Sequence, residues 1–290
     1  YHDVCTNGIG YVDLMFKTDS IAPEQIPYLG LLKSVLGYVD TEHYTYGELF
    51  NEINANTGGI NCGVEVFDRA DSTEEFQAMF SVRGKALYTK MDFLFKMIGE
   101  ILNSSKLEDT KRLYEIVASV KSRAQVNLTG AGHSTAVLRA AAYSSPMAAF
   151  QDEMAGIGYY QFIEKLEKDF EQRKEETVEE LCKLMKKILR PENFMISYTG
   201  ERESLETVQK LAGAVKAGLG TEPVEKSEEK LTCTKKNEGF KTSGQVQYVA
   251  QTGNFKKKGL EYTGALEILK VILSYDYLWM NLRVKGGAYG

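Results

Sequence analysis

Two neighbouring stretches of this chain, residues 60–66 and 76–82, alternate apolar with other residues. The apolar positions are Ile60, Cys62, Val64 and Val66 in the first stretch and Phe76, Ala78, Phe80 and Val82 in the second. A period of two is that of a β-strand with one buried face, because successive side chains of a strand point to opposite faces. Each stretch is therefore predicted to be a strand, and the two are predicted to pair antiparallel.

Further strands are predicted over residues 8–16 and 194–198, and helices over most of the chain between them. Two helices are predicted to begin at Pro23 and at Thr45. Further helices are predicted over residues 87–103, 107–126, 134–144, 147–170 and 174–189, and a last one contains Leu205 and Val215. Thr45 and Glu48 form a capping-box pattern, and the glycines of residues 127–135 are predicted to interrupt the helices. The sequence thus predicts an α/β fold (α+β), a layered and mostly antiparallel sheet with helices on one face.

Residues 221–240 are charged and poor in apolar residues, which is typical of a linker between domains. The linker separates a domain over residues 1–220 from a segment over residues 241–290. In this last segment a strand is predicted over 244–251, followed by a helix and a glycine pair. The same order of elements occurs in residues 8–59, so an internal repeat is predicted whose second copy is truncated.

Composition excludes several classes of partner. The chain of 290 residues carries a formal net charge of −5, which does not suit non-specific binding to nucleic acid. No run of about 18 apolar residues is present, so no membrane span is expected. The sequence begins at Tyr1 without an initiator methionine or a leader, so we expect a piece of a longer protein. A cytoplasmic location is expected by default.

Motifs that would form a catalytic centre are missing. The three histidines, His2, His43 and His133, are scattered, and none belongs to a His-x-x-Glu-His or His-Glu-x-x-His pattern. The sequence also lacks a Gly-x-Ser-x-Gly elbow and a Walker loop. The chain is therefore expected to bind no metal and to be inactive as a peptidase by itself.

The final residues combine a cation, a turn and a phenol. Gly286 and Gly287 allow the chain to turn sharply, which could bring Arg283 and Tyr289 to one cavity. A guanidinium and a phenolic hydroxyl are both donors suited to a carbonyl oxygen or an oxyanion. The alternative is that Arg283 pairs with a surface carboxylate and Tyr289 packs in a sheet.

The segment from Tyr277 to Gly290, YLWMNLRVKGGAYG, resembles the arginine–tyrosine segment of the pitrilysin/insulinase family of inverted-motif zinc metallopeptidases. Its KGGAYG end is most similar to the presequence-protease branch. The stretches TNGIGY at residues 6–11, YGE at 46–48 and NANTGG at 54–59 support the resemblance in order and spacing. The resemblance extends over essentially the whole chain.

This resemblance implies a fold, a cofactor and partners. Family members have four homologous α/β domains in two halves, which close around a peptide. The chain would be the carboxy-terminal half: residues 1–220 as a catalytically degenerate third domain, and residues 241–290 as the start of the fourth. Zinc would be bound by the missing amino-terminal half, and Arg283 and Tyr289 would bind substrate and stabilise the transition state, supported by the turn at Gly286 and Gly287. Peptides and the amino-terminal half would be the partners.

The helix from Pro23 to Gly37 lies where the zinc motif would be in the first domain, and it offers no ligand. Two functions remain open. One is the non-zinc-binding half of a zinc oligopeptidase that degrades peptides in a closed chamber. The alternative is a non-catalytic relative, a scaffold or peptide-binding subunit. A His-x-x-Glu-His motif upstream in the same polypeptide would distinguish them.

Overall fold

The computed structural model describes residues 1–69, 71–227, 229, 231–242 and 245–288. Five strands form one sheet in the order β1-β5-β2-β4-β3. Their bounds are β1 His2–Asp3, β2 Ile9–Lys17, β3 Ile60–Asp68, β4 Phe76–Leu87 and β5 Phe194–Gly200. All neighbours run antiparallel except β1 and β5, which are parallel. The predicted pairing of the two alternating stretches is confirmed, with Cys62 opposite Val82 and Val64 opposite Phe80.

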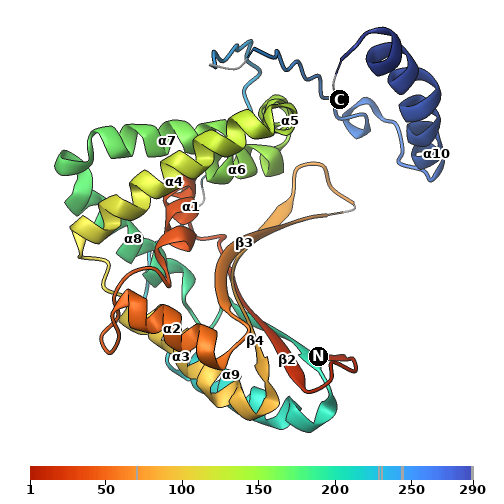
Figure 1. Cartoon of the computed structure of the whole chain (residues 1–290). Helices are drawn as coiled ribbons and strands as arrows, with labels where there is room; N and C mark the ends of the chain where they lie inside the picture. The colour runs from red at the N-terminus through yellow and green to blue at the C-terminus, as the bar shows by residue number, and fades with distance from the viewer. Residues whose placement is uncertain (70, 228, 230, 243–244, 289–290) are drawn as a thin grey trace.

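The helices cover one face of this sheet and leave the other open, as predicted (Figure 1). They are α1 Ile26–Val35, α2 Tyr46–Asn56, α3 Met91–Ser104, α4 Thr110–Gly130, α5 Gly132–Ala142, α6 Pro146–Ala155, α7 Ile157–Lys168, α8 Phe170–Ile188 and α9 Leu205–Ala217. Short 3-10 turns precede α1, α3 and α9. None of the described helices is both long and apolar enough to cross a membrane.

The apolar core lies between the sheet and the helices. Leu14, Phe16 and Phe80 of the sheet are fully buried there, as are Leu32 of α1 and Ile98 of α3. Burial of side chains of this size stabilises a fold by about 1.5–3 kcal/mol each. The capping box is also confirmed: the Thr45 hydroxyl accepts the backbone N–H of Glu48, and a Glu48 carboxylate oxygen accepts that of Thr45 at 2.9 Å.

Two predicted helix boundaries were wrong. The predicted break at 127–135 is confined to Ala131, because α4 continues through Gly130 and α5 starts at Gly132. Glycine within a helix costs only about 1 kcal/mol relative to alanine, which packing can offset. Conversely, the predicted helix 147–170 is divided at Gly156.

Asp152 explains this division. Its carboxylate accepts the backbone N–H groups of Ile157 at 3.0 Å and Gly158 at 3.2 Å, and so satisfies the first donors of α7. A Cβ at Gly156 would lie only 2.9 Å from the Cα of Asp152. The Asp152 side chain of α6 therefore caps the N-terminus of α7, and the absence of a Cβ at Gly156 leaves room for Asp152.

The final segment lacks the predicted strand. Residues 245–251 have no regular secondary structure, while residues 243–244 lie outside the described part. A strand requires a neighbouring strand to pair its backbone groups, and Tyr248 instead lies beside His133 at the start of α5, with ring centroids 6.5 Å apart. The chain then forms α10 Ala265–Ile272 and a π-helix, η5 Leu273–Lys285. The internal repeat stays a prediction.

Candidate functional site

The open face of the sheet presents the polar members of the strand alternation. Gly84 faces the helices, since a Cβ there would lie 2.7 Å from Leu94 Cδ1, so its neighbours Arg83 and Lys85 face away from them. Two cross-strand rows lie side by side on this face, because residues two positions apart share one face of a strand. The row that we call the upper row contains Thr199, Tyr11 and Lys85. The lower row contains Ser197, Asp13, Arg83 and Asn61.

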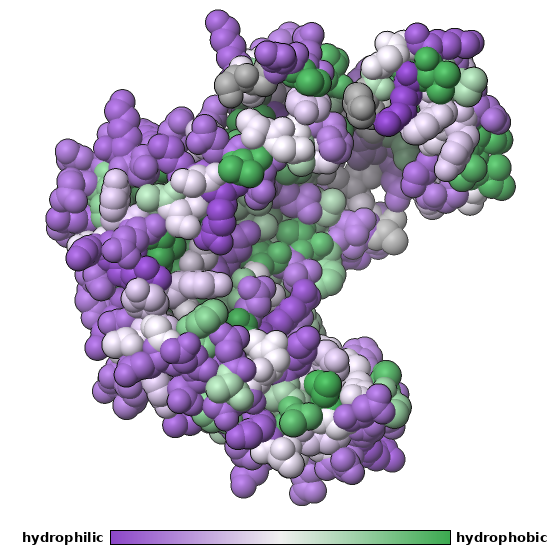
Figure 2. Space-filling view, viewed as in Figure 1, coloured by the Kyte–Doolittle hydropathy of each residue, from purple (hydrophilic) through white to green (hydrophobic). Residues whose placement is uncertain are grey.

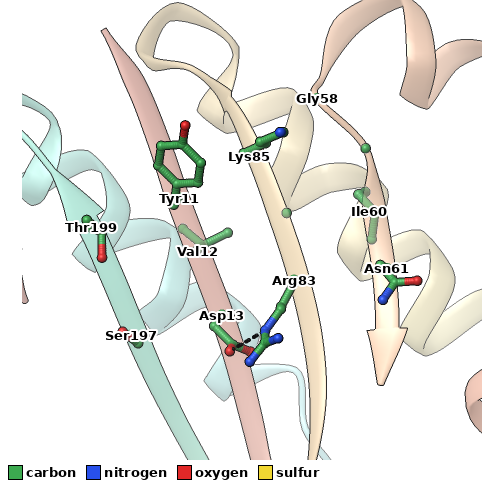
Figure 3. A pocket seen from close by; sticks show the side chains of 12 residues that line it. Tyr11, Val12, Asp13, Gly58, Ile60, Asn61, Arg83, Lys85, Ser197 and Thr199 are labelled. Atoms are coloured by element: carbon green, nitrogen blue, oxygen red, sulfur yellow. Dashed lines mark hydrogen bonds and ion pairs between the residues drawn. The ribbon is translucent and has the colours of Figure 1, made fainter. Parts of the chain in front are cut away.

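This face is hollowed, as the space-filling view shows (Figure 2). A hollow of about 490 Å³ lies over the two rows and reaches the start of β3. Its lining, shown in close-up in Figure 3, is formed by Tyr11, Val12, Asp13, Gly58, Gly59, Ile60, Asn61, Arg83, Gly84, Lys85, Ser197 and Thr199. The hollow is large enough for a few residues of an extended peptide.

The single cation of the lower row is paired with two carboxylates. Arg83 Nε lies 2.8 Å from Asp13 Oδ2, and Arg83 Nη1 lies 3.1 Å from Glu65 Oε1. The hydrogen bond to Asp13 raises the pKa of the Arg83 guanidinium. Asp13 Oδ1 is buried and makes no hydrogen bond within the described part of the chain. The guanidinium of this cluster is therefore already paired and is not available to a ligand.

The upper row differs because its cation is available. The Lys85 side chain is exposed, and its ammonium makes no ion pair with any residue that the structure describes. Its methylene groups lie over Gly58, where a Cβ would be 2.6 Å from Lys85 Cγ and 2.7 Å from Lys85 Cε. Gly58 N–H also donates to the Lys85 carbonyl at 2.7 Å. The missing side chain at Gly58 thus lets Lys85 lie along the rim of the hollow.

The other polar groups of the hollow are neutral. Tyr11, Ser197 and Thr199 supply hydroxyls, and Asn61 supplies an amide. These groups and Lys85 can hydrogen-bond to peptide carbonyls, amides and carboxylates. The hydroxyls, the amide and the ammonium of this lining are suited to binding a peptide.

Of the site residues predicted from sequence, Arg283, Gly286 and Gly287 lie in the described part of the chain and do not line this hollow. Arg283 belongs to η5, where its guanidinium lies 4.7 Å from the centre of the Trp279 ring. Gly287 has a φ of +69°, and its N–H donates to the Arg283 carbonyl at 3.0 Å, so the predicted turn at Gly286 and Gly287 is present. Tyr289 lies outside the described residues. Whether Arg283 and Tyr289 share a cavity therefore stays a prediction.

The described residues contain no group of three or more histidine, cysteine, aspartate or glutamate side chains that could hold a metal. His43 instead lies 3.1 Å from the buried Glu100 carboxylate, His2 is in β1, and His133 contacts Tyr248. The residues of α1, at the position where the resemblance would put a zinc motif, are mainly buried and apolar. The described part of this chain therefore does not fit a zinc site.

Sequence reasoning missed the hollow. Its signal was present in the polar positions of the strands, such as Tyr11 and Asp13 in residues 8–16 and Arg83 just beyond residues 76–82. The position of these side chains in neighbouring rows depends on the strand order β5-β2-β4-β3, which joins segments nearly 190 residues apart, and a local pattern does not determine it.

Comparison with known proteins identifies the family of this chain. The family model for the domain associated with peptidase family M16, subfamily C, matches residues 1–166. Protein HypA of Clostridium perfringens is 37% identical over 290 residues, which are all of this chain and 30% of that protein. Presequence protease 1, chloroplastic/mitochondrial, of Arabidopsis thaliana is 28% identical, over all of this chain and 27% of that protein. The chain thus spans less than a third of the length of these relatives.

Solved structures support the fold alone. A crystal structure described as the peptidase M16 inactive domain from Pseudomonas fluorescens has a TM-score of 0.50 at 15% identity, covering 79% of this chain and 50% of that one. A conserved protein from Enterococcus faecalis has the same TM-score at 13% identity, covering 73% of this chain and 48% of that one.

Proposed function

This chain belongs to the family of domains associated with subfamily C of the M16 peptidases, and on that basis we propose that it is the non-zinc-binding, carboxy-terminal part of a zinc-dependent oligopeptidase. Its open sheet face would form one wall of the chamber in which peptides are bound and degraded. The observation that carries this proposal is the hollow of about 490 Å³, open and lined by polar groups, on the sheet face that no helix of the layer covers.

The chemistry of the hollow supports binding without reaction. Hydroxyls, one amide and one ammonium can each pair with a polar group of an extended peptide. Arg83 pairs with the carboxylates of Asp13 and Glu65, so its guanidinium is not available to a peptide. Zinc, and the residues that hold it, would be supplied by the amino-terminal part of the protein.

Arg283 and Tyr289 have a separate proposed role. In the intact protein they would donate hydrogen bonds to the carbonyl oxygen of the scissile peptide bond, where negative charge develops during hydrolysis. The turn at Gly286 and Gly287, with φ of +69° at Gly287, supports this role because it ends η5 directly after Arg283 and changes the direction of the chain there. Closure of the two halves would complete the site, so activity should depend on that motion.

The alternative is a scaffold or peptide-binding subunit that cleaves nothing. The described part of the chain, which holds no metal-binding group, fits this function equally well. The intact protein with its natural amino-terminal part decides between them. With a labelled peptide longer than about ten residues and one equivalent of zinc, the oligopeptidase hydrolyses the peptide, whereas the scaffold binds it and leaves it intact. The location expected from the sequence, the cytoplasm, also remains a proposal.

A further inference from the structure

The upper row of the hollow contains one charge that no other described group balances. Lys85 on β4 lies opposite Tyr11 on β2, and Tyr11 lies opposite Thr199 on β5. The row thus places an ammonium and two hydroxyls on one face of the sheet, within the lining of one hollow. These three groups can all donate hydrogen bonds, and the ammonium can only donate.

The carboxylates near the lower row pair with Arg83 and make no ion pair with Lys85. The carboxylates of Asp13 and Glu65 are held by Arg83, at 2.8 Å and 3.1 Å. Because Arg83 is paired with both carboxylates, Lys85 is the cation of the hollow that remains available among the described residues. A cation at the rim of a concave, partly desolvated surface attracts an anion more strongly than one on a flat surface.

The absence of a side chain at Gly58 leaves room for the Lys85 side chain. Its aliphatic stem crosses Gly58, at a distance that leaves no room for a Cβ. The side chain is directed towards the end of the hollow next to Gly58 and Gly59, near the start of the edge strand β3 (Figure 3).

We propose that Lys85 is a specificity-determining residue, which binds a carboxylate of the peptide in this hollow, with Tyr11 and Thr199 as additional donors. The proposal rests on the function proposed above and adds the chemical class of the group recognised. The carboxylate can come from the carboxy-terminus of the peptide or from an acidic side chain. Both sources present the same two oxygens to the ammonium.

The test measures binding of fluorescein-labelled twelve-residue peptides to the intact protein, in the presence of a chelator that prevents hydrolysis. One peptide has a free carboxy-terminus and no acidic residue, a second has an amidated terminus and one glutamate, and a third has an amidated terminus and glutamine instead. We expect the first or the second peptide to bind about tenfold more tightly than the third. The source of the carboxylate follows from which of the two shows the preference.

Matched variants assign the preference to Lys85. Lys85→Gln should abolish the tenfold preference, and Lys85→Arg should retain it. Lys17→Gln removes the same charge from β2, on the same face of the sheet but outside the hollow, and should leave the preference unchanged. Equal binding of all three peptides, or a preference that survives in Lys85→Gln, overturns the inference while the proposed function stands. Failure of the intact protein to bind any of them overturns both.

Discussion

Arg139 in α5 binds Glu238 in the linker through two parallel hydrogen bonds, with Nε to Oε2 at 2.8 Å and Nη2 to Oε1 at 3.1 Å. Asp152 of α6 accepts a third bond from Arg139 Nη1 at 2.6 Å, and Tyr143 donates its hydroxyl to Glu238. The Phe240 ring lies 5.7 Å from the guanidinium. A bidentate arginine–carboxylate pair is among the stronger side-chain contacts in proteins. The charged linker is therefore attached to the helical layer and does not run freely through solvent.

We expect Glu238→Gln to release this part of the linker. The variant removes the charge that holds Arg139 and leaves the length and shape of the side chain nearly unchanged. Limited proteolysis of residues 221–240 should become several-fold faster, because cleavage requires a locally open chain. Glu225→Gln, which changes another exposed linker residue, is the control and should cleave at the wild-type rate. Equal rates for wild type and Glu238→Gln would contradict the attachment.

The same attachment should depend on pH. The hydrogen bonds from Arg139 lower the pKa of Glu238 from its ordinary value of 4.5 to about 2. A lowered pKa means that the folded state prefers the ionised form, so the stabilisation is complete above pH 4.5 and is lost as the pH falls towards 2. Hydrogen exchange of residues 231–240, corrected for intrinsic rates, should differ between wild type and Glu238→Gln at pH 6, and the difference should shrink below pH 4.5 and become small near pH 2. A difference as large at pH 2 as at pH 6 would show that the carboxylate is not responsible.

Local patterns in the sequence were sufficient to predict the layers of this fold. The alternation of Cys62 and Val64 and of Phe80 and Val82 specifies which face of each strand is buried, because a shift by one residue would expose all of them. The same reasoning failed for residues 245–251, where Val246, Tyr248 and Ala250 also follow a period of two. Side-chain pattern describes the faces of a strand, but a strand also requires a partner for its backbone, and that partner is not local.

The candidate site was predictable only in part. The turn at Gly287 follows from a property of glycine itself, and its positive φ is found in the structure. The pairing of Tyr11 with Lys85, in contrast, follows from the register of two strands more than 60 residues apart. The role of Gly58 is also non-local, because the side chain that excludes a Cβ there belongs to β4.

Gly30→Ala should destabilise the domain strongly. A Cβ at Gly30 would lie 2.6 Å from the backbone carbonyl oxygen of Met154 and 2.7 Å from Tyr159 Cε2, so α1 would have to move away from α6 and α7. Overpacking of this kind costs about 1–3 kcal/mol. Gly213→Ala in α9 meets nothing within 4 Å and should stabilise the chain by about 0.5–1 kcal/mol. The free energy of unfolding in urea measures both, and a neutral Gly30→Ala would show that these helices are not closely packed.

Substitution by alanine should have different effects at two adjacent glycines of the hollow. Gly58→Ala displaces the flexible Lys85 stem, so it should weaken binding of a carboxylate-bearing peptide several-fold with little change in the free energy of unfolding. The Cβ of Gly59→Ala meets no atom within 4 Å, but the backbone there has a φ of +103°. Alanine adopts such a φ only with strain, so the variant should lower the free energy of unfolding by about 1–3 kcal/mol. Unfolding in urea and peptide binding, measured on both variants, separate the two effects. A destabilised Gly58→Ala with unchanged binding would contradict the proposed contact.

Tyr289→Phe and Arg283→Ala test the proposed role of the final segment in the intact protein. Each removes one donor to the carbonyl oxygen of the scissile bond, and loss of a donor of this kind lowers kcat by about 10²–10³. Tyr289→Phe removes only a hydroxyl, so folding should survive, and the zinc content of the intact protein should not change. Tyr277→Phe removes a hydroxyl from an exposed tyrosine of η5 and should keep wild-type kcat. The measurements are kcat and KM on a peptide longer than about ten residues, with zinc determined on the same samples. If both variants keep a near-wild-type kcat/KM, Arg283 and Tyr289 have structural roles only, because a donor that acts in the transition state cannot be removed without raising the barrier.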